Sequence, residues 1–325
     1  MKRNAIVALL VITLLAMVGC GQASNGSNSY PSGDLTFLVP YPAGGVNDIV
    51  TRQVAQMGKE YFNHPAVVLN RPGASGTLGT TEYMQEKANS HKLLLASRSI
   101  FVTVPLVQDV KYAFSDIEPV IGIDNVEFIF YTNPKKTGID SVESLIEYGK
   151  TNTIKYGSAG PGSDLHLIQA GLFAMAGVKA EAVVFGGGGE AINNVAAGHI
   201  DVAVGPPGAG LTLIKEGSIV PIAVAGPEVY AGFEGMTVPT LKEKGYDISY
   251  PGLNFFAMKA GTDAANIQFM YDQITKIYET EAFKEVVNNT KLDLKPIGPE
   301  EIKQYIAEQQ ATAEKLQELI KKSAQ

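Results

Sequence analysis

Five predicted strands in this 325-residue chain are each followed, at once or within a few residues, by a glycine-rich turn. The first strand, 35–39, passes through Gly44 and Gly45 into residues 46–59, where apolar side chains recur at helical spacing. The other four turns occupy 73–76, 157–163, 186–189 and 205–208. Runs that are apolar throughout and alternate with helices belong to parallel sheets covered on both faces. The sequence therefore predicts an α/β protein whose glycine-rich turns follow the carboxyl ends of its strands.

The strand and helix units fall into two series, which predicts two lobes with a parallel-rich sheet in each. The expected extents are 34–132 together with 251–325 for the first lobe, and 133–250 for the second. Two crossover strands, near 132–134 and near 250–252, would form a hinge. Ligands of open α/β sheets bind beyond the carboxyl ends of the strands. A ligand cleft is therefore expected between the lobes.

Composition excludes several classes of protein. The chain has 26 Lys and Arg against 33 Asp and Glu, and no basic cluster, which argues against nucleic acid as a partner. A single cysteine rules out a disulfide framework. The four histidines lie far apart with no second cysteine, so neither a metal site nor a cofactor is expected.

The N-terminus has the pattern of an export signal. Lys2 and Arg3 precede a 14-residue apolar stretch, 5–18, which is too short to span a bilayer as a helix. Gly19 then precedes Cys20, as in a bacterial lipobox. We expect a signal peptide over 1–19, a lipidated Cys20 and a flexible tether to residue 33. The protein would be anchored at the outer face of the cytoplasmic membrane, or periplasmic if the cell has an outer membrane.

The glycine-rich turns offer backbone N–H groups near helix N-termini, where anions bind without any arginine. The structural alternative is that glycine only permits tight turns. Asp48 and Glu190 each follow such a turn by a few residues. They could form an acid–base pair across the cleft, but acidic side chains in a first helical turn are more often structural. An exported enzyme using Asp48, His166 or Glu190, or a ligand sensor docking on a membrane partner, remains an alternative.

Four ordered motifs are similar to those of the TctC or Bug family, the extracytoplasmic binding proteins of tripartite tricarboxylate transporters. Residues 39–52 resemble the family's P-x-x-x-G-G-x-x-D-x-x-x-R start, and 70–76 its N-x-x-G-A-x-G turn. Residues 160–167, and 187–191 with 198–201, resemble its second-lobe pattern.

The resemblance implies a monomeric, two-lobe periplasmic-binding-protein-like (Venus flytrap) fold that captures a small carboxylate and delivers it to membrane permease subunits. The ligand contacts that it implies are Tyr41, Ala43, Gly44, Gly45, Ser75, Gly76 and Thr77 in the first lobe, and Gly160, Ser163, His166, Gly186, Gly187 and Gly188 in the second. The supporting residues would be Asp48, Arg52, Glu190 and Asp201.

Arg98 departs from the family pattern, because family members generally carry small or polar residues at this strand end. Its guanidinium could hold a second ligand carboxylate in a bidentate fashion. It could equally be a surface ion-pair partner, and the sequence leaves both interpretations open.

Overall fold

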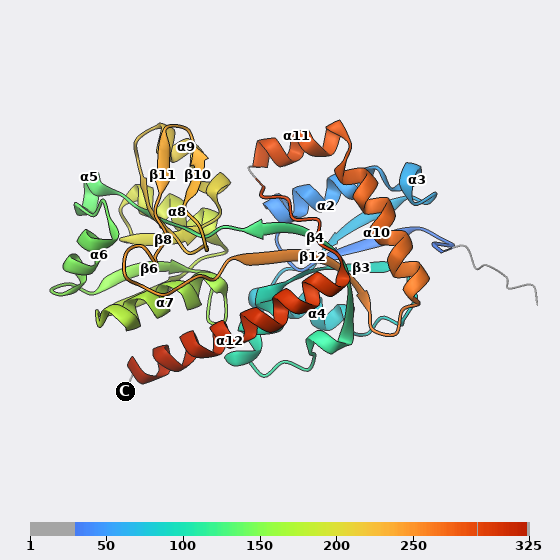
Figure 1. Ribbon diagram of the computed structural model, residues 1–325, viewed down its shortest axis with the longest axis horizontal. Coiled ribbons are helices and arrows are strands. Elements are labelled where there is room, and N and C mark those ends of the chain that lie inside the picture. Colours follow the sequence, from blue (N-terminus) through green and yellow to red (C-terminus); the bar gives the residue numbers. More distant parts are fainter. Residues whose placement is uncertain (1–29, 291, 324–325) are drawn as a thin grey trace, which may run out of the picture.

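Two five-stranded sheets form two lobes in the computed structural model, which describes residues 30–290 and 292–323 (Figure 1). The predicted signal peptide, Cys20 and most of the tether lie outside the described residues. The first sheet has the order β2 (Ala66–Asn70), β1 (Leu35–Val39), β3 (Lys92–Ser97), β12 (Gly252–Lys259) and β4 (Ile117–Val126). β1 runs parallel to β2 and β3, whereas β12 runs antiparallel to both of its neighbours.

The second sheet repeats this plan. Its order is β7 (Ala180–Val184), β6 (Ile154–Ser158), β8 (Val202–Gly205), β5 (Ile129–Thr132) and β9 (Val220–Val224). β6 is parallel to β7 and β8, and β5 is antiparallel to β8 and β9. A hairpin of β10 (Tyr230–Phe233) and β11 (Met236–Val238) adds to this lobe. The predicted two-lobe α/β fold is confirmed. Each five-stranded sheet is mixed, because it contains both parallel and antiparallel strand pairs.

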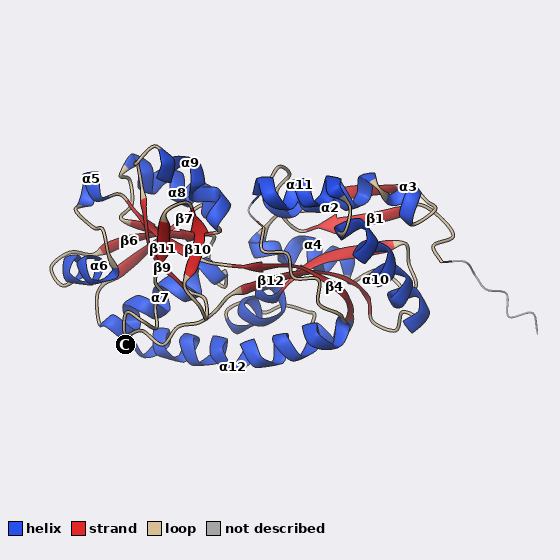
Figure 2. Ribbon diagram, turned by 45° about the horizontal axis from the view of Figure 1, so that its top comes forward, coloured by secondary structure: helices blue, strands red, loops and turns tan. Residues whose placement is uncertain are grey.

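Helices cover both sheets (Figure 2). In the first lobe they are α2 (Val46–Gln56), α3 (Gly58–Tyr61), α4 (Thr77–Tyr83), α10 (Ala264–Tyr278) and α11 (Glu281–Thr290). In the second lobe they are α5 (Pro134–Thr137), α6 (Val142–Gly149), α7 (Asp164–Ala176), α8 (Gly188–Ala197) and α9 (Pro207–Lys215). Short helical turns are η1 (Ala74–Gly76), η2 (Ser99–Thr103), η3 (Val104–Leu106) and η4 (Phe114–Asp116). None of the helices in the part of the chain described combines the length and apolar character needed to cross a membrane.

The central strands are buried because helices lie on both of their faces. Leu93, Leu94, Leu95 and Ala96 of β3 are fully inaccessible to solvent, which explains why this strand is apolar throughout. Side chains of α2, α10 and α11 pack on one face of the first sheet in a single apolar cluster with β1 and β3.

The chain passes between the lobes at two places. The first is residues 127–128, between β4 and β5, and the second leads through Tyr250 and Pro251 into β12. β5 pairs in the second sheet, so the chain has already entered the second lobe several residues before the boundary expected at residue 132.

The last helix, α12 (Pro299–Ser323), extends along both lobes (Figure 2). Its first half packs beside β4, and its second half packs against α7 of the second lobe, where Leu316 contacts the Gly171 position. Ile302, Ile306, Ala313 and Leu316 belong to one apolar cluster with side chains of both lobes. This final helix, expected in the first lobe with the rest of residues 251–325, therefore packs against both lobes.

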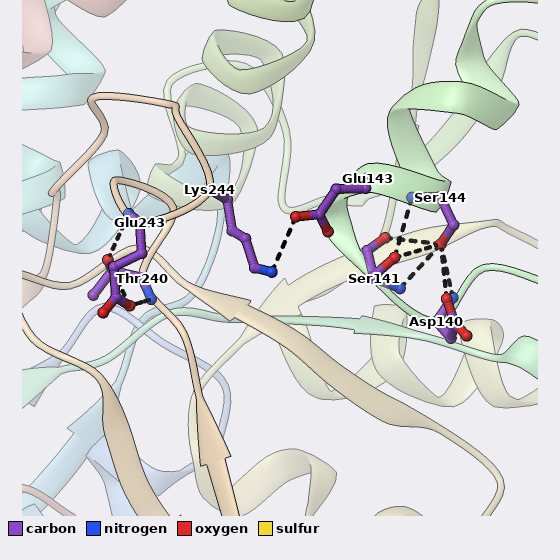
Figure 3. A network of polar contacts seen from close by, with 7 residues as sticks. All are labelled: Asp140, Ser141, Glu143, Ser144, Thr240, Glu243 and Lys244. Carbon is purple, nitrogen blue, oxygen red and sulfur yellow. Dashed lines mark hydrogen bonds and ion pairs between the residues drawn. The ribbon is translucent and has the colours of Figure 1, made fainter.

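Polar contacts hold the segment before the second crossing to the second lobe (Figure 3). Ser141 caps α6 by accepting a hydrogen bond from the Ser144 amide at 3.1 Å. Lys244 Nζ lies 3.0 Å from Oε1 of Glu143, which is also a residue of α6. Residues 240–244 are thereby joined to α6 before the chain returns to the first lobe.

Candidate functional site

Two adjoining cavities lie between the lobes at the carboxyl ends of the strands. One has a volume of about 610 Å³ and the other about 250 Å³. They share lining residues from both lobes, namely Tyr41, Asn47, Val126, Gly186, Gly187, Gly188, Pro206 and Asn254. We call these two cavities together the cleft. Its position is the one that the strand and turn pattern predicted.

The first-lobe turn, residues 40–45, is fixed by a buried carboxylate. The Gly44 amide donates to Asp48 Oδ2 at 2.8 Å, and Gly44 has a φ of 83°, which favours glycine. Arg52 Nε donates to the same oxygen at 2.9 Å, and Asn70 Nδ2 donates to Asp48 Oδ1 at 2.9 Å. Burial by itself would raise the pKa of Asp48, but these hydrogen bonds hold it below its ordinary value. Asp48 and Arg52 therefore fix the shape of the turn through hydrogen bonds within the first lobe.

The second-lobe turn, residues 185–189, uses the same contact with fewer partners. The Gly186 amide donates to Glu190 Oε2 at 2.8 Å, but the Glu190 side chain is exposed and forms no ion pair with any described residue. Close packing favours glycine at position 188: a Cβ there would lie 3.1 Å from Gly205 Cα and 3.1 Å from the Val204 carbonyl oxygen. The start of α8 is therefore packed directly on the end of β8.

Two helix N-termini open into the cleft. Gly45 precedes α2 and Gly187 precedes α8, and neither helix has a side chain capping its first N–H groups. First-turn amides have no intrahelical partner and carry the positive end of the helix dipole. Together they give the cleft anion-binding groups on both sides, whereas its described lining residues include no Lys, Arg or His.

The floor of the cleft contains three polar side chains that sequence reasoning missed. Asn254 Nδ2 of β12 donates to Asp124 Oδ1 of β4 at 2.8 Å and to Asn47 Oδ1 of α2 at 3.1 Å. Asp124 is 6% exposed, and its burial raises its pKa to about 7. A usable signal existed: Asp124 and Asn254 each interrupt an apolar strand, and a polar residue in such a strand needs a partner or a function.

The implied ligand contacts divide into two groups. Tyr41, Gly44, Gly45, Ser163, Gly186, Gly187 and Gly188 line the cleft. Ala43, Ser75, Gly76, Thr77 and Gly160 do not line either cavity. Ser75 Oγ instead lies 3.8 Å from where a Cβ would stand on Gly160, so the turn before α4 faces the second lobe beside the cleft.

His166 lies on the side of α7 away from the cleft. Its Nδ1 is 3.2 Å from the Tyr156 hydroxyl, and both residues line a separate cavity of about 780 Å³ next to the end of α12. Burial lowers the pKa of His166. Asp201 is also distant, because it accepts the Lys155 amide at 2.7 Å at the amino ends of β6 and β8.

Arg98 is enclosed between the lobes and has no exposed surface. Its Nη2 lies 2.9 Å from Asp164 Oδ2 at the start of α7, and its Cζ lies 3.3 Å from the centre of the Tyr250 ring. Thr103 donates to the other Asp164 oxygen at 2.9 Å. The interpretation of Arg98 as a surface ion-pair partner was therefore wrong. Its guanidinium also does not line the cleft. It instead forms a buried ion pair between the two lobes.

The family model described as TctC, tripartite tricarboxylate transporter family receptor, matches residues 50–324. This chain belongs to that family. The TctC-family chain is 28% identical to the protein BugT of Bordetella pertussis, over 84% of this chain and 86% of the relative. It is 25% identical to a Cupriavidus necator protein over 97% of this chain and 94% of that protein.

Solved structures are consistent with this family and with the two-lobe fold. A TctC solute-binding protein from Polaromonas is 25% identical with a TM-score of 0.71, covering 90% of this chain and 99% of that one. An R. palustris protein with adipate has a TM-score of 0.80 at 22% identity, covering 90% and 98%, and supports the fold alone. The TctC family consists of extracytoplasmic, non-enzymatic receptors. The chain is therefore an extracytoplasmic solute receptor, and the enzyme alternative is excluded.

Proposed function

We propose that this receptor captures a small carboxylate in the cleft, that its lobes close by rotating about the two crossings, and that it delivers the ligand to the permease subunits of a tripartite transporter. The ligand's carboxylate would bind the first-turn amides of α2 and α8. Closure would bring these two groups of amides onto opposite sides of one anion.

The observation that carries the proposal is the pair of uncapped helix N-termini facing one cavity of about 610 Å³. Unsatisfied amides at a helix start attract a carboxylate through hydrogen bonds and through the dipole, without a basic side chain. A net charge of −7 does not oppose this, because local dipoles set the field inside a cleft.

The binding energy is sufficient. A micromolar receptor requires about 8 kcal/mol. Three to five charge-assisted hydrogen bonds at ~1.5–3 kcal/mol each, less the ordering costs, reach that value. Two proteins of the same fold support the ligand class, since one was solved with adipate and another, MatC from Rhodopseudomonas palustris, with bound malate.

Replacing Val46 with proline tests the α2 amides. Proline is favoured at the first helical position, and Gly45 already has the extended backbone that precedes proline, so the helix should persist while one amide N–H is lost. Val46→Ala is the matched control, because it shortens the side chain and keeps the N–H. We expect calorimetry to show at least tenfold weaker carboxylate binding for Val46→Pro only. Equal affinity of the two variants would exclude α2 as the anion site.

We further propose that Cys20 is lipidated and holds the receptor at the membrane surface, as the lipobox-like sequence indicates. Cys20→Ser should move the protein from the membrane fraction to the soluble fraction and abolish labelling by a fatty-acid precursor. A membrane-bound, unlabelled wild-type protein would contradict this.

A further inference from the structure

The floor of the cleft carries a carboxylate that no cation within the described residues neutralises. Asp124 lines the larger cavity and is 6% exposed. Its Oδ1 accepts from Asn254 at 2.8 Å, and no side chain of the described residues donates to its Oδ2. No ion pair among residues 30–290 and 292–323 includes Asp124. Apart from the side chain and the backbone amide of Asn254, the buried Asp124 carboxylate therefore has no partner among the described residues.

The other acids in the cleft differ from Asp124. Asp164 lies 2.9 Å from Arg98, and Glu190 accepts from the Gly186 amide. Asp293, a like charge close enough to affect Asp124, makes the charged form of Asp124 less favourable, and the nearby phenols of Tyr41 and Tyr278 carry no charge to offset it. A buried carboxylate without a counter-charge is costly, so it either takes up a proton, as its raised pKa indicates, or pairs with a bound cation.

The neighbours of Asp124 are acceptors as well. Asn254 Nδ2 already donates to Asp124 and to Asn47, which leaves Asn254 Oδ1 without a donor among the described residues. Asn47 lies in the first turn of α2, whose amides are proposed to bind a carboxylate. Two hydrogen bonds, both donated by Asn254, connect this turn to Asp124. One end of the cavity offers donors and the adjacent floor offers acceptors.

Building on the proposed carboxylate function, we propose that the ligand also carries an ammonium group, so that it is an amino acid, and that Asp124 is the residue that selects it. The ammonium donates to Asp124 Oδ2 and Asn254 Oδ1 while the carboxylate binds the helix amides. A plain dicarboxylate would bring a second negative charge to a floor with no base to receive it. A hydroxyl group would satisfy one acceptor but leave the charge of Asp124 unpaired.

The test compares ligands that differ in one substituent. Calorimetry on the wild-type protein with succinate, malate and aspartate, and with glutarate and glutamate, varies hydrogen, hydroxyl and ammonium on one carbon. We expect the amine-bearing acid to bind at least tenfold tighter than its matched partner. Preference for the hydroxyl or unsubstituted acid would overturn the inference while leaving the carboxylate function standing. Binding of no carboxylate at all would instead remove the proposed function itself.

Asp124→Asn then assigns the selectivity to this residue, because it removes the charge with little change of shape. Within this variant, the ratio of the affinities for the amine-bearing acid and its unsubstituted partner should fall at least tenfold from the wild-type ratio. Glu127→Gln is the matched control: Glu127 is a second acid with burial-raised pKa, three residues along the chain, and it does not line the cleft. Unchanged selectivity in Asp124→Asn, or equal loss in Glu127→Gln, would refute the assignment. The wild-type ligand series decides the ligand class even if a variant fails to fold.

Discussion

The two glycine turns that face each other across the cleft contain the same type of hydrogen bond, but neighbouring side chains support it in one turn only. In each, a glycine amide donates to an acid four residues later at 2.8 Å. Asp48 is buried and receives two further side-chain donors, whereas Glu190 is exposed and receives none. The first turn is therefore fixed before ligand arrives, and the second is held mainly by close backbone packing. The same local pattern gives different rigidity because its tertiary partners differ.

Removing the acid from the first turn should have the largest effect. Asp48→Ala leaves the Asn70 amide and the Arg52 guanidinium without their acceptor, so we expect a loss of about 3 kcal/mol of unfolding free energy. Urea denaturation of the unliganded protein measures it. A loss below about 1 kcal/mol would mean that the buried network does not fix the turn.

The next largest effect is the pH dependence of stability that Asp124, on the cleft floor, is expected to cause. The pKa of Asp124 is about 7 in the folded protein against an ordinary 3.8, so between these values the folded state holds a proton that the unfolded state has released. Stability then falls as pH rises, by about 2 kcal/mol from pH 5.5 to 8, and is flat above the folded pKa. Thermal melts of wild type and Asp124→Asn across this range isolate the contribution. Parallel pH profiles for the two proteins would contradict it.

Crowding the second turn should cost less. Gly188→Ala places a Cβ 3.1 Å from backbone atoms of residues 204 and 205, and relief of that contact shifts α8, which costs about 1–2 kcal/mol. Gly189→Ala is the control, because its Cβ would meet no atom within 4 Å. Equal stabilities of the two variants would show that α8 is not packed as tightly on β8 as described.

The smallest effect is expected from the acid of the second turn. Glu190→Ala removes one exposed acceptor, and surface changes of this kind stay within about 0.5 kcal/mol. Urea denaturation beside Asp48→Ala completes the comparison. If Glu190→Ala were as damaging as Asp48→Ala, the proposed difference in rigidity between the turns would be wrong.

The glycine turns and the two-lobe plan could be predicted because they depend on local signals. An apolar run, a glycine turn and a helical period are readable within about 20 residues, and parallel sheets gather such turns at one edge. Asp124 and Asn254 could not be paired in this way, since β12 returns beside β4 some 130 residues later.

Arg98 and His166 show two further limits. The partner of Arg98 is Asp164 in the other lobe, so an arginine after a strand looks the same whether it binds a ligand or an internal acid. His166 depends on the rotation of α7 about its own axis. Ser163 at the helix start faces the cleft, whereas the side chain three residues on points to Tyr156.

The long helix α12 limits how the two lobes can move. Its 25 residues make a rod of about 37 Å that packs on β4 at one end and on α7 at the other. A small twist of one lobe along this rod disturbs the two contacts less than a bend does. Bending the molecule across it must peel one end away and expose apolar side chains such as Leu316 to water. Opening of the cleft about the two crossings is therefore expected to include a twist along α12 rather than a bend across it.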